Sequence, residues 1–237
     1  MIEKFKKYVD KFPKEKGIVY KYNHSLRVMK ICEEIGKSLK LTKEQLEAIK
    51  IMGLLHDFAR FEQWMQYKSF NDLTTFDHGE RSSQLLFDEN KIKDYNLDKK
   101  YYNIVSSAIK NHNKYSIPKM TNKEEELFSK IIRDADKLDI LNKFTKSLLY
   151  EEDNGQSIHK SVEQYFFKHL PVRTPIKRTD NDLIIVKLAF IYDFNFSYSF
   201  KYIKKHKIID RIEKGIDNKL FAKYIKETKK YMEGKIC

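Results

Sequence analysis

The sequence predicts an all-α fold, and three observations support this prediction. Apolar residues recur at helical spacing through almost the whole chain, whereas sustained alternation with a period of two residues is scarce. Residues that interrupt helices are few, with 7 Gly and 4 Pro among 237 residues. Three pairs of residues are spaced as capping boxes at helix starts, namely Thr42 with Gln45, Asp77 with Glu80 and Thr121 with Glu124.

The pattern of the first 76 residues predicts helices near 2–11, 20–38 and 43–57. The second helix has one apolar stripe, formed at offsets of four, seven and eleven by His24, Val28, Ile31 and Ile35. The third helix follows the cap at Thr42, and its inner face includes Ile49, Met52 and His56. Residues 58–76 are predicted to form a loop, although the spacing of Phe61, Trp64 and Tyr67 also fits a helical turn.

The middle of the chain is predicted to form helices near 78–88, 98–112 and 122–148, with a loop at 113–120. The caps at Asp77 and Thr121 begin the first and the last of them. The helix near 98–112 carries a stripe of Val105, Ala108 and His112, and the helix near 122–148 carries a stripe of Phe128, Ile132, Asp136 and Ile140.

The remainder is predicted to form helices near 158–168, 180–194 and 219–233, with a loop at 171–179 where Pro171 and Pro175 interrupt the periodicity. The stretch 181–203 is the most apolar and aromatic of the chain. It is interpreted either as a buried helix that closes the core or as a subunit contact in a homodimer. The predicted organisation is a helical domain over residues 1–150 and a helical extension over 151–237 that packs on the same core.

Composition excludes a membrane-spanning protein, because 34% of residues are charged and no apolar run approaches the ~20 residues that a spanning helix needs. The segment Met1–Lys7 leads into no apolar region of a secretory signal, so the cytoplasm is the expected location. The two cysteines agree with this expectation, since Cys32 lies in an apolar helical pattern, Cys237 is the last residue, and neither forms a CxxC pair.

The net charge of +13 suggests nucleic-acid binding, but the distribution of the charge argues against it. Lysines alternate with acidic and polar residues along the whole length, which is typical of solvated helix faces, and no basic tail concentrates them. No dedicated nucleic-acid binding is therefore expected. A diffuse positive field would still attract a small phosphorylated substrate.

Four histidines and two or three aspartates stand where a helix would turn them inward, which is costly unless a metal or a hydrogen-bond partner compensates. The histidines are His24, His56, His78 and His112, and the aspartates include Asp57 and Asp136. Any one of them has an ordinary explanation, as a hydrogen-bonded core histidine, a solvent-facing residue at a first turn or an exposed charge. Together, on different helices or helix edges, they match the way in which imidazole and carboxylate ligands meet in a helical bundle to hold transition metals.

At these residues the sequence resembles the HD superfamily of metal-dependent phosphohydrolases, an all-α helical bundle. The resemblance covers residues 22 to 140 in five blocks: Tyr22–Val28, Gly53–Asp57, Asp77–Ser82, Ala108–His112 and Ile132–Leu138. It implies a minimal ligand set of His24, His56, Asp57 and Asp136, and the dinuclear variety adds His78 and His112. Asp134 and Asp139 lie close to Asp136 in sequence. The resemblance favours Asp136, because the final Asp of the family precedes a Lys or Arg and a Leu, and Lys137 and Leu138 follow Asp136 here.

The resemblance implies two divalent transition-metal ions that Asp57 bridges and a metal-bound hydroxide that attacks a nucleotide or related small phosphoester. A mixed nitrogen and oxygen ligand set suits Fe, Mn, Co, Ni or Zn without choosing among them. The chain departs from two subsets of the family. Phe58, Ala59 and Arg60 follow Asp57 in place of Ile-Gly, and no GYP element is present, so cyclic-di-GMP is not the expected substrate.

Lys137 and Arg60 are predicted to act with Asp57 in catalysis, because a positive head near the metals could neutralise charge that develops in the transition state. Both are also predicted to bind substrate, together with Asn113 and Lys114, which adjoin His112. The alternative for Lys137 and Arg60 is a solvated surface charge.

Two other functions are compatible with the same ligand residues. A di-iron oxygenase of the HD superfamily resembles this ligand set, and a non-catalytic nucleotide-binding module could keep the metal as a structural staple.

Overall fold

The computed structural model describes residues 1–148, 157–172, 179–216 and 218–236. The chain forms two compact units, Met1–Asp136 and Lys137–Cys237, which divide within helix α7 (Lys123–Leu148). The boundary near residue 150 and the packing of residues 151–237 on the HD-type core stay predictions.

The first unit is helical throughout. Its α-helices are α1 (Ile2–Val9), α2 (Lys16–Ser38), α3 (Lys43–Leu55), α4 (Arg60–Tyr67), α5 (His78–Ser83), α6 (Tyr102–Asn111) and the first part of α7. A π turn η1 (Gln84–Asp88) and two 3-10 turns, η2 (Lys91–Tyr95) and η3 (Lys99–Tyr101), connect α5 to α6. None of the described residues of the chain lies in a β-strand, so the all-α prediction is confirmed.

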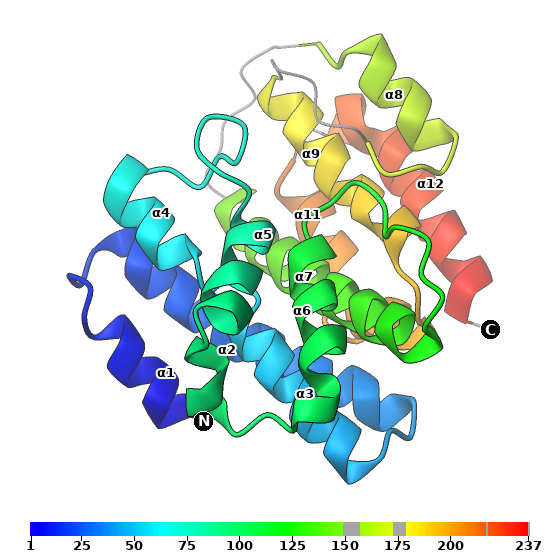
Figure 1. The fold of residues 1–237 in the computed structure, drawn as a ribbon. Coiled ribbons are helices and arrows are strands. Elements are labelled where there is room, and N and C mark those ends of the chain that lie inside the picture. The colour runs from blue at the N-terminus through cyan, green and yellow to red at the C-terminus, as the bar shows by residue number, and fades with distance from the viewer. Residues whose placement is uncertain (149–156, 173–178, 217, 237) are drawn as a thin grey trace. The chain divides into compact units, whose positions relative to one another are not determined.

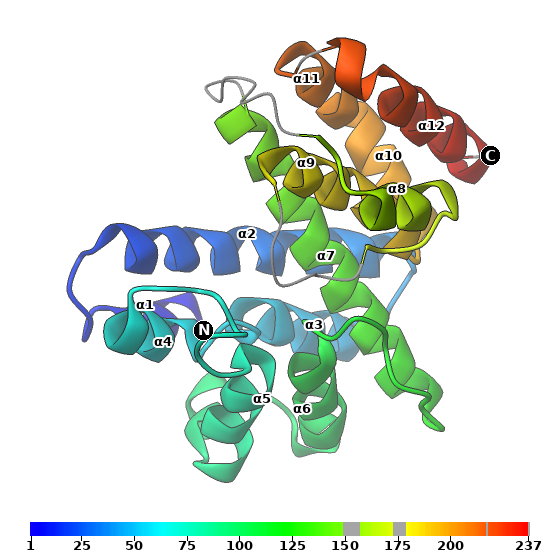
Figure 2. The ribbon, with the colours of Figure 1, turned by 90° about the horizontal axis from the view of Figure 1, so that it is seen from above.

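Helices α2 and α3 lie side by side in the first unit (Figures 1 and 2). A Cβ atom at Gly53 of α3 would lie 2.8 Å from the Cys32 Sγ and 3.0 Å from the Cα of Met29 in α2, so the absence of a side chain allows this approach. Val28 and Met52, both fully buried, belong to the apolar core around this contact. The close contact fixes the two helices that carry the first ligand residues.

Helix α4 lies where the sequence was predicted to form a loop, so that prediction was wrong for residues 60–67. Phe61 is fully buried, and its ring lies 5.8 Å from the ring centroid of Phe5, 5.9 Å from that of Tyr8 and 5.7 Å from that of Phe12. This burial stabilises a helix of eight residues that would be marginal alone, and it agrees with the helical spacing of Phe61 and Trp64.

The caps agree with the sequence at two of three helices. Thr42 and Gln45 form a reciprocal capping box, and the Asp77 side chain accepts from the Glu80 backbone N–H at 3.0 Å. At α7 the Asn122 Oδ1 accepts from the backbone N–H of the two residues that follow Lys123, at 2.9 and 3.3 Å. The cap residue is therefore Asn122, one residue after the predicted Thr121, because asparagine is among the residues most favoured at the start of a helix.

The second unit contains α8 (Lys160–Phe167), α9 (Asp180–Leu188), a 3-10 turn η4 (Ala189–Asp193), α10 (Ser197–Lys205), α11 (Ile208–Lys214) and α12 (Asn218–Ile236). The helix predicted near 180–194 is present as α9 and η4, but the interpretation of 181–203 as one buried helix was wrong, because the chain becomes extended at Phe194 and a new helix starts at Ser197. The polar residues here explain the break, since the Asn195 side chain binds the Asp193 carbonyl oxygen at 3.1 Å and so competes with helical bonding. Helix α11 was not predicted.

Among the described residues, no helix combines the length and the apolar composition that crossing a membrane requires.

Asp182 is a buried carboxylate that links α9 to the segment before α8. It accepts from the backbone N–H and ring Nδ1 of His159, at 2.9 and 2.5 Å, and from the backbone N–H of Thr179 at 3.1 Å. Burial raises the pKa of Asp182, but these donors outweigh it and hold the pKa below its ordinary value. Its stabilising effect is therefore present above the unfolded pKa near 4 and is lost as pH falls through the folded pKa.

Asp182→Asn is expected to cost about 1–2 kcal/mol of stability above pH 5, because the amide accepts fewer bonds from these donors. The deficit relative to the unsubstituted chain should shrink as pH falls below 4. Urea unfolding at several pH values measures it. Asp180→Asn, an exposed change in the same first turn, is the control, and an equal, pH-independent deficit in both variants would contradict the assignment.

Candidate metal centre

The first pair of predicted ligands comes from α2 and from the end of α3. His24 and His56 are both buried, and their Nε2 atoms lie 3.3 Å apart. His56 directly follows Leu55, the last residue of α3, and its Nδ1 donates to the Gly53 carbonyl oxygen at 2.9 Å. The free carbonyl of the last helical turn thus sets the orientation of this ring.

Asp57 follows directly and lies between two groups of histidines. Its Oδ2 atom is 3.4 Å from the Nε2 of His24 and 3.4 Å from the Nε2 of His56. Its Oδ1 atom is 3.3 Å from the Nε2 of His78 and 3.8 Å from the Nε2 of His112. The buried Asp57 carboxylate therefore faces His24 and His56 with Oδ2, and it faces His78 and His112 with Oδ1.

The second pair of histidines comes from α5 and α6. His78 is the first residue of α5 and His112 directly follows the last residue of α6, and their Nε2 atoms lie 3.0 Å apart. The two helices approach closely at Gly79, where a Cβ atom would lie 3.0 Å from the Ile109 carbonyl oxygen. That same carbonyl oxygen accepts from the His112 Nδ1 at 2.6 Å.

Asp136 of α7 completes the cluster. Its Oδ1 lies 3.1 Å from the Nε2 of His24 and 3.7 Å from the Nε2 of His56. Asp134 and Asp139 are buried as well, but among the described residues the groups that could hold a metal include Asp136 and neither neighbour. The structure thus brings all six predicted ligand residues together.

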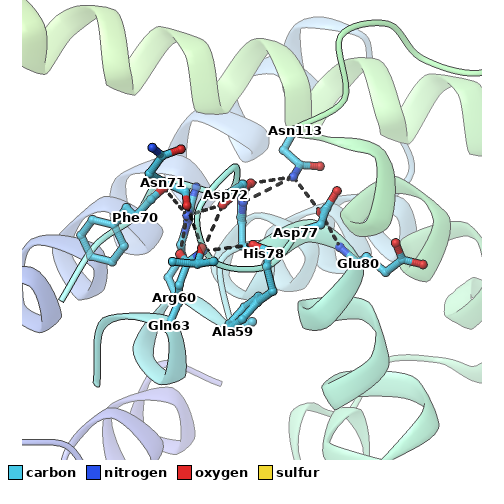
Figure 3. Close-up of polar contacts among 12 residues, drawn as sticks. Ala59, Arg60, Gln63, Phe70, Asn71, Asp72, Asp77, His78, Glu80 and Asn113 are labelled. Atoms are coloured by element: carbon cyan, nitrogen blue, oxygen red, sulfur yellow. Dashed lines mark hydrogen bonds and ion pairs between the residues drawn. The ribbon is translucent and has the colours of Figure 1, made fainter. Parts of the chain in front are cut away.

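The hydrogen bonds of the rings show that this cluster fits a cation. A carbonyl oxygen only accepts, so the His112 Nδ1 carries a proton, and the His78 Nδ1 faces the Asp72 Oδ2 at 2.5 Å (Figure 3). In their neutral forms both rings then direct Nε2 lone pairs at each other across 3.0 Å. This arrangement is repulsive unless a positive charge lies between the two atoms, so the donor set suits a metal ion.

The spacing of the donor atoms agrees with this interpretation. Two ligands about 2.1 Å from a first-row metal lie roughly 3.0–3.4 Å apart at octahedral or tetrahedral angles. Most of the donor distances fall in or near this interval, including 3.3 Å from His24 to His56 and 3.0 Å from His78 to His112.

The two carboxylates are ionised in this environment. Burial raises the pKa of Asp57, but the Lys21 ammonium and the His56 ring outweigh it, and the pKa lies well below its usual range. Burial also raises the pKa of Asp136, and hydrogen bonds from His24 and His56 again outweigh it and hold the pKa well below its usual range. Both side chains therefore present negative oxygens, as metal ligation requires.

The second histidine pair is neutral near pH 7. Burial lowers the pKa of His112 well below its ordinary value, and the neighbouring His78 and His56 act in the same direction. Burial also lowers the pKa of His78, against the hydrogen bond to Asp72 that raises it. These imidazoles keep their lone pairs available.

Arg60, a predicted catalytic and substrate-binding residue, lies beside this centre. Its Nε is 3.6 Å from the Asp57 Oδ1, and its Nη1 binds the Gln63 side chain, the Phe70 carbonyl oxygen at 2.8 Å and the Asp72 Oδ1 at 2.8 Å (Figure 3). The guanidinium thus ties the segment after α4 to the centre. Contact with substrate stays a prediction.

The other predicted substrate residues have defined partners. The Asn113 Nδ2 donates to Asp72 at 3.1 Å and to Asp77 at 2.8 Å, and Lys114 forms an ion pair with Asp77. Lys137 follows the ligand Asp136 in sequence, and its Nζ makes an ion pair with Asp193 at 2.8 Å. The catalytic role of Lys137 and the substrate contacts of all three residues stay predictions.

Two charged residues of the site were missed from the sequence. The Nζ of Lys21 lies 2.7 Å from the Asp57 Oδ2, and Lys21 is buried three residues before His24 on the same helix. That spacing was a usable signal, but lysines were interpreted as solvated charge. Asp72 lies in a segment without periodicity, so no sequence pattern indicated it.

A family model for the HD domain matches residues 22–141. The chain belongs to the HD domain family. The match covers just over half of the chain and contains all six ligand residues. Members of this family are generally metal-dependent phosphohydrolases, and the clustered His and Asp side chains of this HD domain are consistent with a divalent metal. Neither the comparison with curated proteins nor the comparison with solved structures gave a match.

Proposed function

We propose that this HD domain protein hydrolyses a nucleotide or related small phosphoester with the aid of two divalent transition-metal ions. The observation that carries the proposal is the position of Asp57, whose two oxygens face different imidazole pairs at 3.3–3.8 Å. A carboxylate that served a single ion would not need histidines on both sides. His24, His56 and Asp136 would hold one ion with Asp57, and His78 and His112 would hold the other.

When bound, the ions would lower the pKa of a water molecule towards neutrality and polarise the phosphoryl group that it attacks. The chain supplies the rest. Asp57 holds the two ligand groups together, and the neutral rings of His78 and His112 keep their lone pairs directed inward. The nitrogen and oxygen donors favour Fe, Mn, Co, Ni or Zn over Ca or Mg.

The positive side chains near the centre would bind the substrate phosphate. Lys21 is the strongest candidate, because its ammonium lies 2.7 Å from Asp57 and would add charge where phosphate oxygens gather. Arg60, Asn113 and Lys114 lie on the side of Asp72 and Asp77 and would extend this contact. Lys137 is kept as a further candidate for binding the phosphate because it directly follows the ligand Asp136 in sequence.

The test begins with metal analysis of the purified chain, followed by a screen of phosphorylated metabolites with the best metal. We expect two ions per chain and release of product from at least one phosphoester, lost on chelation and restored by the metal. A fully metallated chain without phosphoester turnover would contradict the proposal. Oxygen uptake by iron-loaded protein would then support the oxygenase alternative, and tight nucleotide binding without turnover would support the binding module.

The proposed partner is a small phosphorylated molecule and not a nucleic acid, so substrate affinity should not show the steep salt dependence of a phosphate backbone. Cytoplasmic location and a homodimer formed through residues 181–203 stay predictions from the sequence.

A further inference from the structure

Asp72 lies at the centre of a polar network on one side of the cluster (Figure 3). Its Oδ1 accepts from the Nη1 of Arg60 at 2.8 Å and from the Nε2 of Gln63 at 3.1 Å, both on α4. Its Oδ2 accepts from the Nδ2 of Asn113 at 3.1 Å and faces the Nδ1 of His78 at 2.5 Å. Three separate parts of the first unit thus converge on one carboxylate.

The ring of His78 needs such a partner for a local reason. His56 and His112 directly follow the last residues of α3 and α6, so each Nδ1 donates to a carbonyl oxygen three residues earlier, at Gly53 and Ile109. His78 is the first residue of α5, and no helical turn precedes it. Its Nδ1 therefore cannot use a helical carbonyl, and a side chain from the segment after α4 occupies the equivalent place.

The contact also decides which nitrogen of His78 is available. A carboxylate accepts, so the Nδ1 that faces Asp72 carries the proton, and the Nε2 keeps its lone pair. That Nε2 is 3.3 Å from the Asp57 Oδ1 and 3.0 Å from the His112 Nε2. A carboxylate that accepts from the second nitrogen of a metal-binding imidazole fixes the tautomer and plane of the ring and makes the imidazole a stronger ligand.

We propose that Asp72 is a positioning residue for His78 and thereby for one of two metal ions, the one on the side of His78 and His112. The inference rests on the proposed dinuclear centre. Arg60, Gln63 and Asn113 hold Asp72 in place, and Asp72 in turn holds the His78 Nε2 towards Asp57. Loss of its carboxylate therefore weakens one ion selectively and leaves the ion of His24, His56 and Asp136 in place.

The first experiment is a Co²⁺ titration of metal-free protein, followed by chelator competition and by the visible absorption of bound cobalt. Asp72→Asn is expected to weaken the binding of one of the two ions about 10–100-fold and to leave the affinity of the other within threefold. The weakened binding step should be the one that His78→Ala abolishes in the same titration. Two ions with unchanged affinities in Asp72→Asn would overturn the inference.

Asp77→Asn is the matched control, because Asp77 also binds Asn113 and caps α5, and asparagine caps equally well. Both ions should stay within threefold of the unsubstituted chain. Asp72, Asp77 and His78 are also close enough to hold an ion among themselves. If they did so, Asp77→Asn would lose an ion as Asp72→Asn does, and the positioning role would be wrong.

The second experiment needs no variant. Nitrogen-15 NMR of the metal-free chain is expected to show His78 protonated at Nδ1 and unprotonated at Nε2, and a spectrum with the proton on Nε2 would overturn the inference even if Asp72→Asn failed to fold. It also separates the two proposals. A chain that binds no metal but shows this tautomer refutes the dinuclear function, whereas a chain with two ions and the opposite tautomer refutes only the role of Asp72.

Discussion

Asp57→Ala is expected to release both metal ions and to lower phosphoester turnover by about 10³-fold or more. Asp57 faces both imidazole pairs, so its removal takes one ligand from each proposed site at once. Activation of water and stabilisation of the phosphoryl charge each contribute several kcal/mol when an ion is bound, and about 1.4 kcal/mol corresponds to a factor of ten in rate. Metal analysis and steady-state kinetics measure the two effects.

Asp57→Asn separates ligand loss from misfolding. Alanine would leave the buried ammonium of Lys21 without its partner at 2.7 Å, which is costly by itself. Asparagine also removes the negative charge, but it keeps the size of the side chain and an oxygen that can accept from the Lys21 ammonium, so it should disturb the fold less than alanine and still lose metal. Asp10→Ala, an exposed change at a residue paired with Lys6, is the control and should retain both ions. A fully metallated, fully active Asp57→Asn protein would refute the dinuclear proposal.

The six residues could be singled out because burial of a polar group is costly and therefore visible in a sequence, and the resemblance to the HD superfamily assigned them as ligands. His24 lies on the same stripe as Val28 and Ile35, and an imidazole in such a stripe requires a partner. The position of each ligand at a helix interior or helix edge then follows from local periodicity. The same reasoning could not set the distances between helices, which depend on tertiary packing.

Lys21 and Asp72 escaped prediction for different reasons. Lys21 lies three residues before His24 and so on a neighbouring part of the same helix face. In a chain with 47 lysines and arginines, however, one buried ammonium is hard to distinguish from many solvated ones. Asp72 lies in an irregular segment. The position of this segment is set by contacts such as those of the Arg60 guanidinium with Phe70 and Asp72, which form only in the folded chain. Side chains in such segments leave no periodic signal.

Helices α4, α10 and α11 could not be predicted as separate helices from the apolar periodicity of the sequence. Each has nine residues or fewer, so intrinsic propensity contributes little and tertiary burial decides. Phe61 shows this in α4, since its neighbours Phe5 and Phe12 come from a distant part of the sequence. Long helices such as α2 and α7 were predicted because their apolar stripes extend over several turns.

The packing of α2 on α3 leads to a second large effect, because Gly53→Ala should destabilise the chain although alanine favours helices. A Cβ atom would lie 2.8 Å from the Cys32 Sγ and 3.0 Å from the Met29 Cα, and the second atom belongs to the backbone of α2. Overpacking of this kind costs about 1–3 kcal/mol, which exceeds the gain of up to about 1 kcal/mol from helix propensity. Metal affinity should fall as well, since α2 carries His24 and His56 directly follows α3.

Gly234→Ala provides the matched control within α12. Among the described residues, and apart from the backbone of its own helix and its chain neighbours, no atom lies within 4 Å of a Cβ atom there, so helix propensity dominates and stability should stay level or rise by up to about 1 kcal/mol. The two variants make the same chemical change and are expected to shift the midpoint of urea unfolding in opposite directions. If Gly53→Ala stabilised the chain as Gly234→Ala does, the α2–α3 contact would tolerate a side chain at residue 53. The separation of His24 from His56 would then have to be fixed by something other than the close approach of these helices.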